Sequence, residues 1–295
     1  HFPEFTTSAP LLHIAKYQDE NEKVEYLKAH TDLKIEETPA DIKALLTAYT
    51  DGFSSVYLKD NAILEDKAIC VAMLKGLYYH QFKAEDPLYE HGLWDVCGYH
   101  SKRVVLCTGA YDELVKEEYL KLRRIYGQRC EVTSSTQMKA TVHHEVSVSA
   151  TKKNGRIAIG ASHYLNEEDI PAPKEGAKAL IDLAKKSVRL GEIEIENIYC
   201  GMRSGSNDYF PIIGPLVDSK KSLDLDSAAL NGDKTASVVH YPELYMINGA
   251  GGYGFVLAPL LKDILSRHSV DEEPLPESWP AKRFYYRWAN TAGTL

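Results

Sequence analysis

The most informative pattern of apolar and polar positions lies near the end of the chain, between Leu244 and His268. An apolar run over 244–247 leads into a segment that contains four glycines, Gly249, Gly251, Gly252 and Gly254. After them, apolar side chains recur at helical spacing from 255 to 265. The pattern predicts a strand, a glycine turn and a helix, with a backbone that a ligand can approach closely.

Three of these glycines match G-x-G-x-x-G, the spacing of a dinucleotide-binding turn. Such a turn opens a βαβ unit, and its second strand ends in an acidic residue roughly twenty residues further on. Here the helix runs instead into DEEPLP at 271–276, which is unsuited to a central parallel strand. We therefore predict a ligand site at this turn, but not the first strand of a dinucleotide-binding unit.

The rest of the chain predicts a mixture of helices and strands. Helical spacing indicates helices over 20–30, 62–80 and 175–190, a helix or helical turn over 113–126, and another helix that begins after Thr38-Pro39. Unbroken apolar positions at 104–107 indicate a buried parallel strand. Alternation on both sides of Asn154-Gly155 predicts an antiparallel hairpin within a sheet over 130–164.

Composition and charge narrow the class of protein without identifying it. The chain has 295 residues, of which 44% are hydrophobic, and 34 basic against 42 acidic residues give a net charge of −8. Bulk charge thus gives no sign of nucleic-acid binding, although a local basic patch is compatible with it. Five scattered cysteines without a C-x-x-C pair, and no apolar run of membrane-spanning length, predict a cytoplasmic location.

Candidate chemistry centres on Arg203, which lies in the segment 201–214. A planar guanidinium at a strand end suits the binding of a substrate carboxylate, and an ion pair with Asp208 is the equally weighted alternative. Asp208 itself precedes a Pro-x-x-Gly sequence and favours a turn role. His143 and His144 lack further ligands at metal-site spacing, so we predict no metal site.

Two aromatic features leave alternatives open. Tyr253, inside the glycine turn, either reaches into a site or covers the entrance of the helix. The basic and aromatic end at 282–288 either stacks on nucleic-acid bases with its cations on phosphates, or forms an amphipathic helix docked on the protein.

Three segments together resemble the D-amino-acid oxidase and glycine oxidase superfamily of FAD-dependent amine oxidoreductases. They are VVLCTGA at 104–110, GMRSGSNDYFPIIG at 201–214 and NGAGGYGFVLAP at 248–259. GASHY at 160–164 and the ending at 271–293 resemble, more narrowly, the FAD-dependent part of the MnmC family, which modifies the wobble uridine of tRNA.

The resemblance implies FAD as cofactor and tRNA as substrate, with no membrane partner. The implied reaction removes the carboxymethyl group from carboxymethylaminomethyl-(2-thio)uridine and releases glyoxylate. It implies that Arg203 binds the substrate carboxylate and that Tyr253 lines the site. The implied cofactor-binding residues are Thr108, Gly109, Ala110, Gly251, Gly252, Tyr253, Gly254 and Phe255.

The implied fold is mixed α/β, with a D-amino-acid-oxidase-like FAD-binding domain interleaved with an antiparallel-sheet substrate domain. We expect substrate-domain parts at 1–56 and 128–198, FAD-domain parts at 57–127 and 199–270, and a tail at 271–295. The family's first segment, an ADP-binding Rossmann βαβ unit, has no counterpart before Leu11. This motivates the expectation that an upstream segment or a partner chain supplies it.

Two other functions remain open from the sequence. One is a small-amine or amino-acid oxidase or dehydrogenase of the glycine oxidase type. The other is a non-catalytic subunit that retains the flavin fold and binds RNA or a partner through its basic aromatic end.

Overall fold

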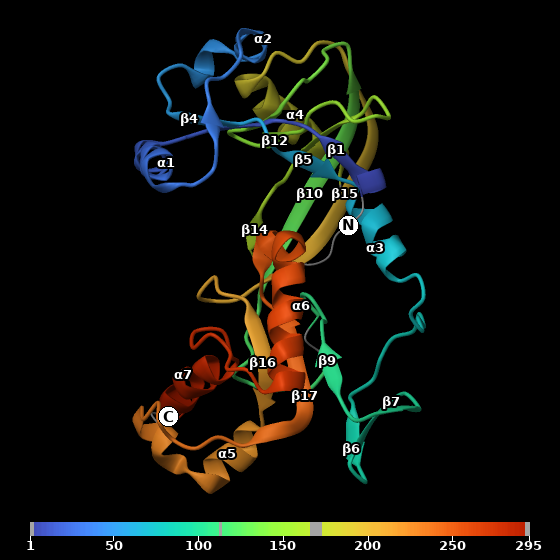
Figure 1. Cartoon of the computed structure of the whole chain (residues 1–295), viewed down its shortest axis with the longest axis vertical. Coiled ribbons are helices and arrows are strands. Elements are labelled where there is room, and N and C mark those ends of the chain that lie inside the picture. The colour runs from blue at the N-terminus through green and yellow to red at the C-terminus, as the bar shows by residue number, and fades with distance from the viewer. Residues whose placement is uncertain (1–2, 112–113, 166–172, 293–295) are drawn as a thin grey trace. The chain divides into compact units, whose positions relative to one another are not determined.

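A computed structural model describes residues 3–111, 114–165 and 173–292 of the chain (Figure 1). The chain forms two compact units, each with its own core. The first contains His1–Tyr79, Tyr126–Tyr164 and Glu168–Gly201, and the second contains His80–Ile125, Leu165–Glu167 and Met202–Leu295. The chain passes repeatedly between the units, and the expected assignment of segments to FAD and substrate domains stays a prediction.

A mixed sheet organises the first unit. Within the described residues its strand order is β14-β10-β13-β12-β11-β2-β4-β3, and β15 also pairs with β10. β11 and β2 run parallel, whereas β10 and β13 are antiparallel. The strands are β2 (Leu11–Ile14), β3 (Ile35–Glu36), β4 (Ser55–Leu58), β10 (Arg123–Ser134), β11 (Thr141–His143), β12 (Ser147–Val148), β13 (Ile157–Gly160), β14 (Tyr164–Leu165) and β15 (Ile193–Gly205).

The expected hairpin around Asn154-Gly155 is confirmed. β12 and β13 are antiparallel, with Val148 opposite Ile159. The turn is closed by a hydrogen bond of 2.9 Å from the Lys152 amide to the Arg156 carbonyl, and Gly155 has a φ of +78°. The predicted helix over 175–190 is also confirmed as α4 (Lys174–Ser187), whose buried Ala177, Leu180 and Ile181 pack on the sheet.

Shorter elements complete the first unit. They are η1 (Pro3–Phe5), α1 (Gln18–His30), α2 (Ala40–Lys43), η2 (Ala48–Thr50), α3 (Asp66–Met73) and the pair β1 (Thr6–Ser8) and β5 (Ala62–Leu64). The predicted helix over 62–80 is wrong at both ends. Ile63 lies in β5 opposite Thr7, so strand pairing takes the first residues, and the helix ends well before Gly76, which has a φ of +87°.

The second unit is built on a three-stranded sheet with helices on both faces. Its order is β16 (Ile212–Val217), β17 (His240–Asn248), β9 (Val104–Leu106), and β9 runs parallel to β17. Side chains that alternate along β16 and β17 separate the two faces. Ile213 and Tyr245 pack with Leu261 and Leu265 of α6 (Gly254–Asp271).

The opposite face of this sheet packs against α7 (Lys282–Ala292). Ile212, Leu244 and Met246 of the sheet share a core with Phe284, Tyr285 and Ala289 of the helix. The remaining elements of this unit are β6 (Leu88–Glu90), β7 (Leu93–Val96), β8 (Tyr99–Ser101), α5 (Ser219–Leu225), η3 (Ser227–Asn231) and η4 (Gly251–Tyr253). The chain end is thus a docked amphipathic helix, one of the two expected alternatives.

Two further predictions need correction. The strand at 104–107 is parallel as expected, but it is not fully buried, since Val105 is 46% exposed and β9 pairs only with β17 among the described strands. Of the two alternatives predicted for 113–126, the helix is absent from the described residues, because turns lead into β10 at Arg123. A helical turn fits the hydrogen bond of 3.0 Å from the Leu120 amide to the Glu117 carbonyl. Tyr119 and Leu120 are buried in the core shared with α7, and this tertiary packing outweighs the helical spacing. No helix among the described residues has the length and apolarity needed to cross a membrane.

Candidate functional site

The glycine turn after β17 forms one wall of a cavity of about 230 Å³. The strand, turn and helix predicted from the sequence are present as β17, η4 and α6. The cavity also receives the end of β9 and the end of β15, so three separate parts of the second unit meet there. Its lining consists of Cys107, Gly109, Ser204, Ile247, Asn248, Gly249, Ala250, Gly251, Gly254, Ala258 and Leu261.

Asn248, the last residue of β17, holds these three parts together. Its side chain is buried, and its amide nitrogen donates to the Thr108 hydroxyl at 3.2 Å and to the Gly109 carbonyl at 2.9 Å. Its amide oxygen accepts hydrogen bonds from the Ser204 hydroxyl at 2.6 Å and from the Gly249 amide at 2.8 Å. A carbonyl on one side and a backbone N–H on the other define the orientation of the amide group.

Close backbone approach requires glycine at 249. Its φ is +72°, and a Cβ atom there would lie 3.2 Å from the Cβ atom of Ser206. The Ser206 amide donates to the Gly249 carbonyl at 3.0 Å, which joins the two segments directly. The first glycine of the turn is therefore needed for packing within the protein, in addition to its place in the cavity lining.

The start of α6 offers polar backbone to the cavity. Gly254 begins this helix with a φ of −52° and a ψ of −46°, and it lines the cavity together with Gly251. The first amides of a helix lack partners within the helix, and the helix dipole places partial positive charge at the same end. The cavity therefore combines glycine clearance with an environment that favours an electron-rich group.

The structure brings together only part of the predicted cofactor-binding set. Gly109, Gly251 and Gly254 line the cavity, and Thr108 contributes through its bond to Asn248. Ala110 is buried. Tyr253 is 73% exposed, and Gly252 and Phe255 are also exposed. These three residues, two in the turn and Phe255 in α6, lie outside the cavity lining of the described chain, and the assignment of the set to FAD stays a proposal.

Arg203 lies next to Ser204 near the end of β15. Alternation along a strand directs neighbouring side chains to opposite faces, and Arg203 is not among the described residues that line the cavity. Its side chain is partly buried, and burial lowers the pKa of the guanidinium. A partly buried guanidinium at this point is compatible with a carboxylate ligand.

Asp208 is bound by a different arginine. Nε and Nη2 of Arg283, in α7, donate to the two carboxylate oxygens of Asp208 at 2.8 and 3.1 Å. Burial raises the pKa of Asp208. The hydrogen bonds and charge of Arg283 and the hydrogen bond from the Ser206 hydroxyl lower it by more, so the pKa is lowered overall. The Phe210 amide also donates to this carboxylate at 3.3 Å, in agreement with the predicted turn role.

Sequence reasoning missed Asn248, Ser204 and Arg283. An asparagine that ends a buried strand and precedes a glycine turn is a recognisable signal, because its amide can satisfy both a carbonyl and an N–H. Ser204 and Arg283 carry no such local signal, since their partners lie 44 and 75 residues away in the sequence.

The described residues contain no cluster of acidic, histidine or cysteine side chains arranged to hold a metal ion. His143 stacks on His13 at 5.1 Å, and its Nδ1 lies 2.6 Å from the Ser147 hydroxyl. Burial and the neighbouring His13 and Lys16 lower the pKa of His143 to about 4. His144 is buried beside Ser187.

Comparison with known proteins shows which family the chain matches. Residues 6–267 match the family model described as DAO, FAD dependent oxidoreductase. The protein named tRNA 5-methylaminomethyl-2-thiouridine biosynthesis bifunctional protein MnmC from Pseudomonas putida strain F1 is 32% identical over 192 residues, which cover 59% of this chain and 29% of that protein. The protein of the same name from Stutzerimonas stutzeri strain A1501 is 27% identical over 252 residues, covering 78% and 38%.

Solved structures show a similar fold at low sequence identity. Glycine oxidase from Bacillus cereus ATCC 14579 aligns with a TM-score of 0.67 and 17% identity, covering 92% of this chain and 74% of that one. L-proline dehydrogenase from P. horikoshii aligns with a TM-score of 0.70 and 13% identity, covering 98% and 80%. The matched segments span about 29% and 38% of the two curated relatives described above.

The cavity lining fits one edge of FAD. The glycines leave room for a flat ring, the start of α6 favours its carbonyl oxygens, and the cavity of about 230 Å³ admits part of such a cofactor. The Cys107 thiol also faces the cavity, and desolvation raises its pKa, so it stays uncharged at neutral pH. Among the described residues, no charged side chain lines the cavity, so none opposes negative charge on a bound ring.

Proposed function

Because the chain belongs to the DAO family of FAD dependent oxidoreductases, with a match over residues 6–267, we propose that it oxidises a secondary amine of modified tRNA. The substrate is carboxymethylaminomethyl-(2-thio)uridine at the wobble position. The products are aminomethyl-(2-thio)uridine and glyoxylate. The similarity to MnmC proteins of two species, up to 32% identical, supports this choice of substrate.

The chemistry balances with FAD and water as the other reactants. Bound FAD would supply the oxidation by accepting a hydride, that is two electrons and one hydrogen, from the methylene carbon beside the carboxylate, while the amine nitrogen gives up its proton. The carbon–nitrogen bond of the substrate becomes an imine, water adds to its carbon, and the carbon–nitrogen bond then breaks. The nitrogen leaves as the amine of the uridine, and the two-carbon fragment leaves as glyoxylate.

The residues of the chain supply binding and electrostatics. The amides at the start of α6 stabilise negative charge at the ring edge, and Gly251 and Gly254 give the ring clearance. Asn248 keeps the end of β9, the end of β15 and the glycine turn in one arrangement. We assign the substrate carboxylate to Arg203 and the edge of the site to Tyr253.

The observation that carries the proposal is the cavity at the glycine turn, which is held together by the side chain of Asn248 and bordered by the N-terminus of α6. A site of this kind holds a flat, electron-rich group by its backbone, and residues from β9, β15 and β17 converge on it. Within a family of FAD dependent oxidoreductases, this group is the flavin edge.

A second candidate is an oxidase of small amines. It is favoured by the fold alone, since glycine oxidase and iminodiacetate oxidase (IdaA) from Chelativorans sp. BNC1, the latter at 14% identity, both align with a TM-score of 0.67. The same arginine would bind the carboxylate of either kind of substrate, so the two functions differ in what surrounds the amine. The third candidate is a non-catalytic subunit that binds RNA or a partner and turns over no substrate.

The test is an assay for glyoxylate with two classes of substrate. We expect flavin absorbance that bleaches anaerobically with carboxymethylaminomethyl tRNA, together with release of glyoxylate in equal amount. Bleaching by glycine, sarcosine or D-amino acids but not by tRNA would replace the first candidate by the second. Flavin that no substrate reduces, or an absence of bound flavin, would contradict both.

Arg203 provides the matched variants for this assay. We expect Arg203→Met to raise KM for the carboxymethyl substrate by roughly one hundredfold, the loss of a charged hydrogen-bonded pair worth about 3 kcal/mol. Arg203→Lys keeps the charge and loses the planar fork, so it should lie between the two. Equal KM values in all three proteins would remove Arg203 from the carboxylate site.

A further inference from the structure

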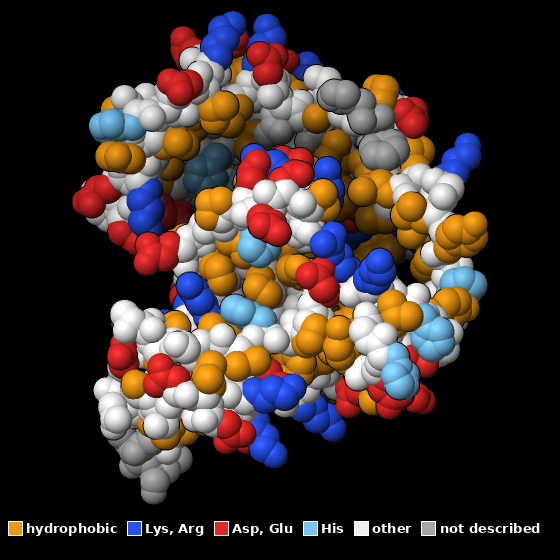
Figure 2. Space-filling model, turned by 60° about the horizontal axis from the view of Figure 1, so that its bottom comes forward, with side chains coloured by type: hydrophobic (Ala, Val, Ile, Leu, Met, Phe, Trp, Pro, Cys, Tyr) orange, Lys and Arg blue, Asp and Glu red, His pale blue; other side chains and the backbone are white. Residues whose placement is uncertain are grey.

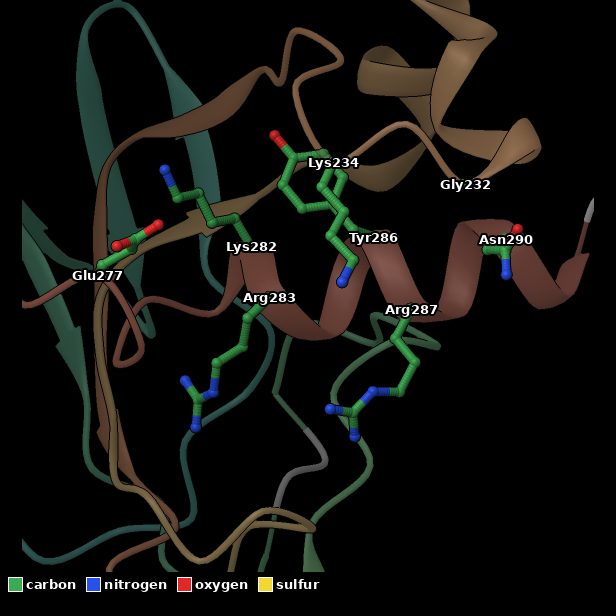
Figure 3. Close-up of a pocket in the computed structure, with 8 residues that line it drawn as sticks. All are labelled: Gly232, Lys234, Glu277, Lys282, Arg283, Tyr286, Arg287 and Asn290. Carbon is green, nitrogen blue, oxygen red and sulfur yellow. The ribbon is translucent and has the colours of Figure 1, made fainter.

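A second cavity lies along α7, in the same unit as the glycine turn. Its volume is about 400 Å³, and it is lined by Gly232, Lys234, Glu277, Lys282, Arg283, Tyr286, Arg287 and Asn290 (Figure 3). Four of these eight side chains are basic and one is acidic. Arg283 and Arg287 are one helical turn apart and extend from the same side of α7.

Arg283 belongs to the framework of this cavity. Its guanidinium binds both oxygens of Asp208 and also donates to the carbonyls of Trp279, Pro280 and Phe210. These bonds occupy its donors and neutralise its charge. They also anchor the first turn of α7 to the segment that follows β15.

The other three cations are available to a ligand. Lys234, Lys282 and Arg287 are exposed, and no carboxylate among the described residues lies within ion-pair distance of them. The guanidinium of Arg287 lies over the Phe284 ring, 5.8 Å from its centroid. Glu277 is the single acid in the lining, so the cavity keeps an excess of positive charge.

This excess contrasts with the net charge of −8 of the chain as a whole. On the face shown in Figure 2, basic, acidic and hydrophobic side chains are interspersed. Three unpaired cations around one hollow are therefore a local departure, of a kind that attracts a polyanion at short range. The hollow also presents the ring of Tyr286 and the amide of Asn290, which suit a sugar or a base beside a phosphate.

We propose that the α7 cavity binds the phosphodiester backbone of a structured RNA, with Lys234, Lys282 and Arg287 as its phosphate ligands. The choice of RNA rests on the proposed function, whereas the choice of an anion rests on the charges alone. Contacts of this kind position a nucleic acid without reading its sequence. The site would hold tRNA at a point outside the cavity of the glycine turn.

The test compares two double variants with equal changes of charge. Lys282→Gln with Arg287→Gln removes two cations of the cavity. Lys102→Gln with Lys262→Gln removes two exposed cations of the same unit that do not line it. Binding of unmodified tRNA to the purified protein is measured by fluorescence anisotropy at several salt concentrations, and circular dichroism checks that each variant is folded.

We expect the cavity variant to bind tRNA roughly tenfold more weakly near 0.1 M salt and its slope of log affinity against log salt to fall by about two. The control variant should bind within twofold of the wild type. The charge-preserving pair Lys282→Arg and Arg287→Lys should retain binding, which excludes a general effect on α7.

Equal losses in the cavity and control variants would overturn the proposal. So would a cavity variant that binds tRNA as well as the wild type does but no longer binds poly-glutamate, because the cavity would then bind acidic polypeptides and not RNA. Its failure is separable from that of the proposed function. If the wild type and the cavity variant both release glyoxylate from tRNA and bind tRNA with equal affinity, only the cavity proposal is refuted. Turnover of small amines alone, with tRNA still bound through the cavity, would remove only the function.

Discussion

Gly254 allows the cavity at the glycine turn to be tested by a change that helps the folded chain. Its φ of −52° and ψ of −46° are helical, and a Cβ atom there would meet the Cβ atom of Ala250 at 3.9 Å, an ordinary contact. Alanine in a helix is favoured over glycine by roughly 0.5–1 kcal/mol. Because Gly254 is the first residue of α6 and not an interior one, Gly254→Ala should stabilise the protein without cofactor by at most about that amount.

The same methyl group would enter the lining of the cavity. Where a ring approaches the backbone closely, an added methyl costs about 1–3 kcal/mol, as in an overpacked core. At about 1.4 kcal/mol for each tenfold change, FAD should bind roughly 5- to 150-fold more weakly. The variant should thus gain stability as apoprotein and lose affinity for its cofactor.

The assay combines denaturant unfolding of the apoprotein with titration of FAD by its fluorescence. Ser266→Ala is the matched control, because Ser266 is an exposed residue of the same helix and alanine raises helix propensity there too. It should stabilise the apoprotein and leave FAD affinity unchanged. Undiminished FAD binding by Gly254→Ala would refute the placement of the flavin edge at this helix end.

Three further predictions concern the polar contacts. Asn248→Ala should destabilise the apoprotein by about 2–4 kcal/mol in denaturant unfolding, since it strands a buried N–H and a buried carbonyl; a change below 0.5 kcal/mol would contradict this. Asp208→Asn should cost about 1 kcal/mol at pH 7. Because the folded pKa of Asp208 is lowered, its stabilisation is present above the ordinary Asp range and is lost as pH falls, so wild type and variant should converge in acid. The pKa of His143 is lowered to about 4 in the folded chain, so between pH 6.5 and 4 the unfolded chain binds a proton at this residue that the folded chain does not bind. The free energy of unfolding therefore falls as the pH falls through this window, and His143→Gln should make this fall less steep.

Local pattern predicted the parts of the fold in which sequence neighbours determine structure. The hairpin at Asn154-Gly155 follows from a turn that only a few residue types adopt, and α4 follows from an apolar stripe on one face. The strand, turn and helix over 244–268 were also predicted, because glycine spacing and periodicity changed together there.

The failures lie where distant partners decide. Ile63 pairs with Thr7 in a strand and is thereby excluded from the helix that the spacing over 62–80 favoured, so the helix begins only at Asp66. In the candidate site, the sequence indicated the glycine turn but not Asn248, whose four hydrogen-bond partners come from three different segments. The pair of Asp208 and Arg283 was missed for the same reason, since nothing near either residue specifies the other.

The amide of Asn248 has a consequence for tolerance to mutation. Aspartate would present an oxygen to the Gly109 carbonyl, glutamine would be one methylene too long, and leucine would leave the Gly249 amide without an acceptor. Every one of the nineteen replacements thus breaks at least one buried bond. A selection for activity should consequently rank this position among the least replaceable in the chain, because its side chain holds three segments of the site together.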